Sequence, residues 1–102
     1  MILVYVTCAS ASEAEKIGKA LVEKRLAACA VVVPRVKSFF MWKGKLGKKT
    51  EALLFLKASA SAGNKKRLEK EILRMHSYET PCILFFKPQA SKNYAAWAEG
   101  KN

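Results

Sequence analysis

The chain has 102 residues, of which 51% are hydrophobic and 26% are charged, a balance typical of a folded globular protein and not of a disordered one. We expect a single domain, residues 1–102. Lys and Arg number 19 against 8 acidic residues, which gives a formal charge of +11. Such a surplus favours non-specific binding to acidic surfaces and nucleic acids. Basic side chains that simply keep the protein surface solvated are the simpler explanation, so we expect no nucleic-acid partner.

No apolar run reaches the roughly 18–20 residues that span a bilayer, so we expect no membrane partner. The N-terminal segment lacks the basic region and the cleavage site of a signal peptide, which predicts a cytoplasmic protein. The three cysteines, Cys8, Cys29 and Cys82, are widely spaced. This spacing argues against a disulfide framework and against a closed zinc site within one chain.

A strand and a helix open the chain. Residues 2–7 are almost all apolar, which is typical of a strand buried on both faces. Ser12 followed by Glu15 has the spacing of a capping box, which predicts a helix start there. The apolar residues of this helix recur at the helical period: Ala14, Ile17, Leu21 and, after a slip, Leu26.

A long hairpin follows the first helix. Residues 30–42 and 51–58 have the composition of two strands, joined by a lysine-rich turn at 43–49. The first strand would reach about 40 Å at roughly 3.3 Å per residue, which is longer than a domain of this size covers. Pro34 cannot donate a ladder hydrogen bond, so it marks an edge position, a bulge or a break. If the strand is unbroken, its far end is expected to lie against another chain.

The second half of the chain adds a helix, a strand and a last helix. Leu68, Ile72 and Met75 form the inner stripe of a helix that ends near residues 76–77. Residues 82–86 include four large apolar side chains and predict a strand inside the sheet. Either Ser91 or Asn93 can cap a short last helix, which carries the aromatic residues Tyr94 and Trp97.

The predicted element order is β-α-β-β-α-β followed by a helix. This order indicates an α+β fold, namely a ferredoxin-like sandwich with a C-terminal helix and a long central hairpin. Helices then cover one face of the sheet, and no segment remains to cover the apolar opposite face. Self-association is the simplest way to cover it.

No catalytic motif, phosphate loop or single-chain metal motif occurs, so we expect no catalytic residues and no enzyme. His76, the single histidine, either complements a helix dipole or binds a metal. As a ligand it needs partners, and a Cys8 thiolate at the end of the first strand suits copper(I) or zinc. Glu51 and Lys57 point to the same face of one strand, either as edge charges or as a polar pair lining a cleft between subunits.

Several segments together resemble the CutA divalent-cation-tolerance proteins: VEKRLAACA at residues 22–30, WKGK at 42–45, Glu51 with Lys57, HSYETP at 76–81, and Tyr94 with Trp97. The resemblance runs in order over essentially the whole chain. It implies a cytosolic, non-enzymatic homotrimer that assembles by pairing of sheet edges. It also implies a link to tolerance of copper and other divalent metals, with no required cofactor and copper or another divalent metal as the bound ion.

The resemblance also implies site residues. The metal position falls on His76, with Cys8 as the matching thiol and Val6 where some members use a cysteine. Ser77 replaces the usual proline, and the hairpin tip, commonly acidic in the family, is rich in lysine. The resemblance implies a polar cluster in the cleft between subunits, formed by Cys29, Glu51, Lys57 and Tyr78. It also implies that the hairpin is anchored on a neighbouring subunit, with Phe39, Phe40 and Trp42 at the trimer interface.

Three functions stay open on the sequence alone. The first is a trimeric CutA-like protein with weak or conditional binding of divalent metal through His76 and Cys8. The second is a sensor resembling the PII signalling proteins, which binds an anionic small molecule at the subunit cleft through Lys57. The third is a basic nucleic-acid-binding module, which would need exposed stacking aromatics on the sheet. Phe39, Phe40 and Phe55 are better explained as interface or core residues.

Overall fold

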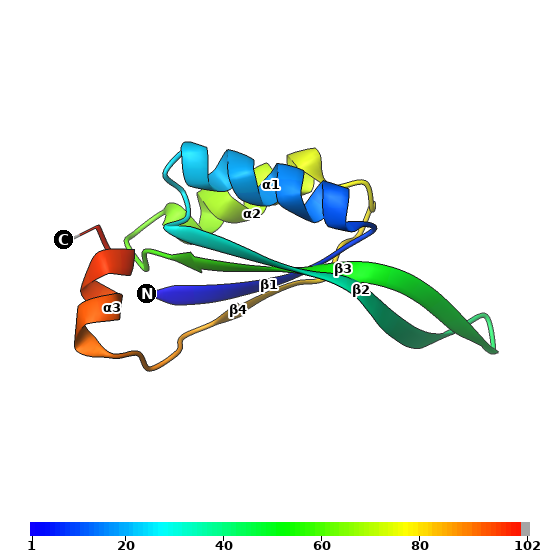
Figure 1. Ribbon diagram of the computed structural model, residues 1–102. Coiled ribbons are helices and arrows are strands. Elements are labelled where there is room, and N and C mark those ends of the chain that lie inside the picture. The colour runs from blue at the N-terminus through cyan, green and yellow to red at the C-terminus, as the bar shows by residue number, and fades with distance from the viewer. Residues whose placement is uncertain (101–102) are drawn as a thin grey trace.

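The computed structural model describes residues 1–100. Its elements follow in the order β1 (Ile2–Cys8), α1 (Ala11–Glu23), β2 (Cys29–Trp42), β3 (Lys45–Ala58), α2 (Asn64–Met75), β4 (Ile83–Phe86) and α3 (Lys92–Ala98). Figure 1 shows α1 and α2 over one face of the sheet, with α3 beside the N-terminus. This arrangement confirms the predicted ferredoxin-like α+β fold. Within residues 1–100, none of the helices combines the length and the hydropathy needed to cross a bilayer.

The four strands form one antiparallel sheet in the order β2-β3-β1-β4. Among the strands of residues 1–100, β4 pairs only with β1, so it is an edge strand, and the prediction that residues 82–86 lie inside the sheet is wrong. Its large side chains are misleading because half of them face away from the core. Leu84 and Phe86 are 46% and 48% exposed.

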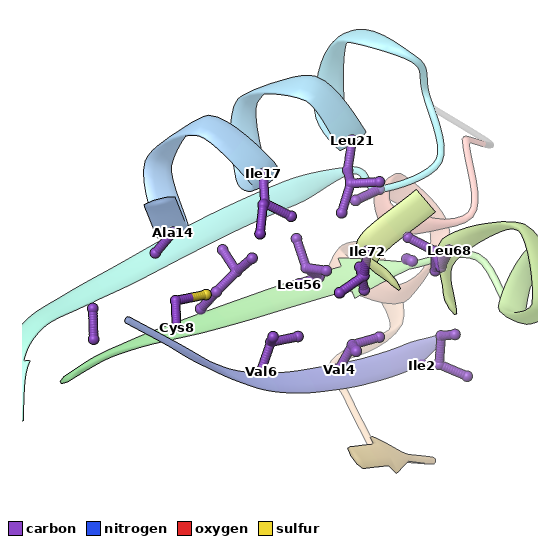
Figure 2. Close-up of a cluster of buried hydrophobic side chains, with 14 residues drawn as sticks. Ile2, Val4, Val6, Cys8, Ala14, Ile17, Leu21, Leu56, Leu68 and Ile72 are labelled. Atoms are coloured by element: carbon purple, nitrogen blue, oxygen red, sulfur yellow. The ribbon is translucent and has the colours of Figure 1, made fainter. Parts of the chain in front are cut away.

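The core lies between the helix pair and the sheet. Figure 2 shows side chains from α1, α2 and the strands converging there. Most of each predicted inner stripe is confirmed, because Ala14, Ile17 and Leu21 of α1 and Leu68 and Ile72 of α2 are buried. The other two predicted members, Leu26 and Met75, are only partly buried, and Leu26 lies beyond the end of α1 at Glu23. β1 alternates between buried and half-buried residues, so the chain buries one face of this strand and not two. The other face of the sheet has no layer over it within residues 1–100 (Figure 1).

The capping box of α1 lies two residues earlier than predicted. The Ser10 hydroxyl accepts a hydrogen bond from the Glu13 amide at 3.1 Å, and Glu13 Oε1 accepts one from the Ala9 amide at 2.9 Å. Ser12 and Glu15 have the same spacing but lie inside the helix. The strand ends at Cys8, so the chain must begin its helix at the first serine that follows.

The hairpin is longer than predicted. β2 and β3 are 14 residues each, and only Lys43 and Gly44 separate them. Both turn residues have positive φ, 51° and 77°, as a two-residue type I′ turn requires. The predicted turn at 43–49 and the predicted strand start at 51 are therefore wrong, because residues 45–49 pair with residues 38–42.

We call residues 35–50 the arm. The arm extends beyond the helices (Figure 1), and the molecule measures 48 × 26 × 22 Å. The radius of gyration is 14.4 Å, against about 13 Å for a compact chain of this length. The projecting arm accounts for the difference.

Pro34 and Arg35 form a bulge in β2, one of the predicted alternatives. Val33 pairs with Leu53 and Val36 with Glu51, so two residues of β2 face one residue of β3. The strand is not broken, and it lies at the sheet edge, where a proline is tolerated. The extra residue reverses the alternation of side chains along β2. Even-numbered residues of β2 after the bulge therefore share a face with odd-numbered residues before it.

Candidate functional site

Three donor groups meet at the end of β1. Cys8 is the last residue of β1, Glu13 lies in the first turn of α1, and His76 follows α2. One donor atom from each residue lies within 4.8 Å of the other two. The fold thus brings the two predicted metal ligands together and adds Glu13, which the sequence reasoning missed. The signal for Glu13 was its spacing from Ser10, because the capping box turns its carboxylate back over the end of β1.

His76 is buried, with a side chain that is 0% exposed. The Tyr78 amide donates to His76 Nδ1 at 3.0 Å, so this nitrogen carries no proton. Nε2 therefore carries the proton and donates to the Thr7 carbonyl at 2.8 Å. Both ring nitrogens are occupied, and the imidazole joins the end of β1 to the segment after α2.

The Cys8 side chain is fully buried. Burial raises the pKa of its thiol to about 12, and the nearby carboxylates of Glu13 and Glu51 act in the same direction. The thiolate is the form that binds metals and attacks electrophiles. At neutral pH Cys8 is a protonated thiol, so its closeness to His76 does not make an activated catalytic pair.

The Glu13 carboxylate is held by two backbone amides. It accepts hydrogen bonds from Ala9 and from Ser77, each at 2.9 Å, and Oε1 lies 3.8 Å from His76 Nδ1. Burial raises the pKa of Glu13, but the hydrogen bonds from Ser77 and Ala9 outweigh it. The pKa therefore lies below the ordinary value, and the carboxylate is charged at neutral pH.

A thiol, a carboxylate and an imidazole form a donor set that suits zinc or copper, and their separation is small enough for one ion. The group fits a metal in its composition. In this conformation, however, both ring nitrogens of His76 are engaged in hydrogen bonds and the Cys8 sulfur carries a proton, so neither residue is free to bind an ion. An ion would have to displace that proton and one hydrogen bond of the imidazole.

A second polar group lies at the base of the arm. The Tyr78 hydroxyl donates to Glu51 Oε2 at 2.6 Å, and Lys49 Nζ lies 4.3 Å from the centre of the Tyr78 ring. Burial raises the pKa of Glu51, but hydrogen bonds from Ser38 and Tyr78 and the Lys49 charge bring it below the ordinary value. Burial and the contact with Glu51 raise the pKa of Tyr78 far above its ordinary value. Tyr78 is therefore a fixed donor and Glu51 a fixed acceptor.

Cys29 and Lys57 lie elsewhere in the subunit. They are directly opposite each other on β2 and β3, and Lys57 Nζ lies 5.7 Å from the centre of the Tyr94 ring. Lys57 is six residues from Glu51 along β3, or about 20 Å at 3.3 Å per residue. Within one chain, the four residues predicted for a single cleft thus form two separate pairs: Glu51 with Tyr78, and Cys29 with Lys57.

The three predicted anchors of the arm do not share a face. Residues directly opposite each other in the hairpin point to the same side, and Phe40 is opposite Gly47, whereas Phe39 is opposite Lys48. A Cβ at Gly47 would lie 2.5 Å from the Phe40 ring, so the ring packs on the glycine backbone. We define two faces by their residues: the Phe40 face is Ser38, Phe40, Trp42, Lys45 and Gly47, and the Phe39 face is Lys37, Phe39, Met41, Leu46 and Lys48.

The Phe40 face continues the uncovered face of the sheet. The bulge brings Val31 and Val33 to the same side as Phe40 and Trp42. The neighbouring strands add further apolar side chains to this side, and Tyr5 and Phe55 pack edge to face with ring centres 5.5 Å apart. A single apolar surface therefore runs from β4 across the sheet and along the arm.

Comparisons with known proteins agree with this fold. The model of the CutA1 divalent ion tolerance protein family matches residues 2–101. The divalent-cation tolerance protein CutA of Archaeoglobus fulgidus is 45% identical over 80 residues, which are 78% of this chain and 76% of that protein. The Xenopus laevis protein CutA homolog is 38% identical over 95 residues, 91% of this chain, but the chain spans only 61% of that longer relative.

Solved structures give the same result. The structure described as the periplasmic divalent cation tolerance protein CutA of Archaeoglobus fulgidus superposes with a TM-score of 0.88 at 36% identity. The superposition covers 99% of this chain and 98% of that one. Because the family model covers residues 2–101 and the relatives share both sequence and fold, the chain belongs to the CutA1 divalent ion tolerance family.

Proposed function

We propose that the protein supports tolerance of divalent cations, copper among them, as a non-enzymatic homotrimer. The observation that carries the proposal is the apolar surface that joins the uncovered sheet face to the Phe40 face of the arm. Val31, Leu84, Phe86 and Trp42 on this surface are each at least 40% exposed. An apolar surface that extends over four strands is larger than monomers usually leave in water. A closed ring of subunits would cover it without leaving free edges.

Assembly can be tested by measuring the mass by light scattering at several concentrations. We expect a trimer for the wild type and a monomer for Phe40→Ser/Trp42→Ser. The matched control is Phe39→Ser/Met41→Ser, which removes similar apolar area from the opposite face and is expected to leave the trimer intact. A wild type that stays monomeric at every concentration would contradict the proposal.

The bound ion is the cargo in this proposal, and Cys8, Glu13 and His76 are the residues that would hold it. Support comes from their donor types and their mutual distances. The buried thiol must lose its proton first, and its pKa of about 12 lies above the working range. The apparent affinity should therefore rise with pH, by about tenfold per unit, because each bound ion releases one proton from sulfur.

Titration of copper(I) at several pH values tests this site. We expect Cys8→Ser to weaken binding and to remove its pH dependence. Cys82→Ser, which changes an exposed thiol elsewhere, should behave as the wild type. Identical isotherms for the wild type and Cys8→Ser would remove this cluster as the metal site.

The cytoplasm is the proposed location, whereas the Archaeoglobus fulgidus structure is described as periplasmic. Cell fractionation decides between the two compartments. Detection of the protein only in the envelope or periplasmic fraction would contradict a cytoplasmic role.

A sensor that binds an anionic small molecule is the second candidate function. It is supported by Lys57, which lies half-buried on β3 opposite Cys29 and near Tyr94. Nucleotides at millimolar concentration should then raise the melting temperature of the wild type but not of Lys57→Met. No response in the wild type would eliminate this candidate.

A further inference from the structure

The two ring nitrogens of His76 are not equally suited to an ion. Nδ1 is the nitrogen near the other donors, since Oε1 of Glu13 lies 3.8 Å from it, and it carries no proton. Nε2 donates its proton to the Thr7 carbonyl at 2.8 Å. An ion on Nε2 would have to remove that proton and leave the carbonyl without its partner. Histidine ligands usually keep a hydrogen bond from their other nitrogen, often to a backbone carbonyl, so the geometry favours Nδ1.

Binding at Nδ1 displaces the amide of Tyr78. This nitrogen has one lone pair, for which the ion and the amide compete. A zinc–nitrogen bond is about 2.0–2.1 Å long, whereas the Tyr78 nitrogen lies only 3.0 Å from Nδ1, so the backbone at residue 78 has to move away. Glu13 differs because its carboxylate has two oxygens: Oε2 can keep the Ser77 amide at 2.9 Å while Oε1 takes part in the site.

The other end of Tyr78 is held at the base of the arm. Its hydroxyl donates to Glu51 Oε2 at 2.6 Å, and Lys49 Nζ lies 4.3 Å from the centre of its ring. Glu51 and Lys49 both belong to β3, at the point where the arm joins the body. The Tyr78 ring also packs near the imidazole, with ring centres 5.0 Å apart. One residue thus connects a donor of the ion site with the start of the arm.

We propose that Tyr78 couples occupancy of the ion site to the base of the arm. Without an ion, its amide binds Nδ1 and its hydroxyl binds Glu51. An ion on Nδ1 moves residue 78, and the hydroxyl leaves Glu51, because an O–H···O hydrogen bond spans only about 2.5–3.0 Å. The coupling is reciprocal, so the contacts that hold Tyr78 in place weaken ion binding. Tyr78 is then a positioning residue and not a ligand. The coupling rests on the ion site proposed above.

Nuclear magnetic resonance of the full chain, with zinc(II) as a diamagnetic probe, tests the movement. With zinc bound, we expect His76 to keep its Nε2 proton and the Tyr78 amide to exchange faster with solvent, while the Ser77 amide stays protected. Resonances of Lys49 and Glu51 should shift, and those of residues 66–70 in α2 should not. Loss of the Nε2 proton, or unchanged protection of the Tyr78 amide, would overturn the proposal.

A tyrosine variant tests the coupling energy. Tyr78→Phe removes the tether to Glu51 and should raise the affinity for zinc by about fivefold, the change that one net hydrogen bond corresponds to. The matched control is Tyr94→Phe, since Tyr94 also lies beside a lysine, Lys57, but outside this cluster. Its affinity should equal that of the wild type. An unchanged or lower affinity for Tyr78→Phe would mean that the peptide group turns without the ring, and the coupling would be refuted.

The variant Cys8→Ser separates this proposal from the proposed ion site. A wild type that binds no zinc, or that binds it as Cys8→Ser does, refutes the ion site and the coupling together. Zinc binding that depends on Cys8 but leaves the Tyr78 amide protected refutes the coupling alone. Circular dichroism of each variant checks that the fold is retained.

Discussion

The body and the arm share two strands but place them in opposite environments. In the body, even-numbered residues of β3 such as Leu54 are fully buried beneath the helices. In the arm, Leu46 of the same strand and the same parity is 70% exposed. A two-stranded ribbon is marginally stable alone in water, so the arm gains little from its own apolar side chains. In the described residues, these exposed side chains therefore contribute much less to stability than the buried side chains of the body.

The largest expected effect comes from comparing these two leucines. Leu54→Ala should reduce the free energy of unfolding by about 2–5 kcal/mol, because it leaves a cavity in a packed core. Leu46→Ala should change it by less than about 0.5 kcal/mol. Urea unfolding of dilute protein measures both values. A similar loss for the two variants would show that the tip of the arm is packed in the dissociated subunit, contrary to the comparison.

His76 provides the next effect, at the border between body and arm. His76→Ala leaves the Thr7 carbonyl and the Tyr78 amide without these partners. A fully buried unsatisfied group costs about 1–3 kcal/mol, and these two hydrogen bonds are only part-buried, so the total loss should be smaller than that of Leu54→Ala. Faster hydrogen exchange at the Tyr78 amide and a lower melting temperature should follow. Tyr78→Phe is the matched control, because it removes only the hydroxyl contact with Glu51. An unchanged melting temperature for His76→Ala would mean that the imidazole does not hold this junction.

Acid should produce the smallest effect, and it should act on the body alone. The pKa values of Glu13 and Glu51 are lowered in the folded protein from an ordinary value of 4.5. Their contribution to stability is therefore complete above about pH 4.5 and is lost as the pH falls through the lowered values. Thermal unfolding measured from neutral pH down to about pH 3 should show this loss. Glu13→Gln should make the profile flatter.

The arm supplies the control for the acid experiment, since residues 35–50 contain no carboxylate. Lys48→Gln should leave the slope of stability against pH unchanged below pH 4.5. A wild-type stability that is constant over this range would show that the two carboxylates gain nothing from their partners.

Much of the fold follows from local patterns in the sequence. Ala14, Ile17 and Leu21 recur at the helical period and are buried in α1, as are Leu68 and Ile72 in α2. The patterns fail where two local solutions compete. Ser10–Glu13 and Ser12–Glu15 have equal spacing, and only the end of β1 selects the first. The tip lysines suggested a loop, but a two-residue turn at Lys43–Gly44 brings residues 45–49 into β3.

The candidate site was predictable only in part. The residue types of Cys8 and His76 mark them as donors, but Glu13 joins them through a turn that no spacing between the three reveals. The protonation of the thiol and the imidazole depends on burial and on backbone groups of other elements. Such contacts are not encoded in a local pattern.

The sequence by itself determined the order of elements, the apolar stripes and the basic stretch without acids, because these depend on residue type and short-range period. Only the tertiary structure decided which arm residues share a face. Phe39, Phe40 and Trp42 are close in sequence, yet Phe39 points to one face of the hairpin and the other two point to the other face. One extra residue at Pro34–Arg35 then aligns Phe40 and Trp42 with the open face of the sheet. Register between strands arises from pairing between distant segments, and that pairing forms only in the folded chain.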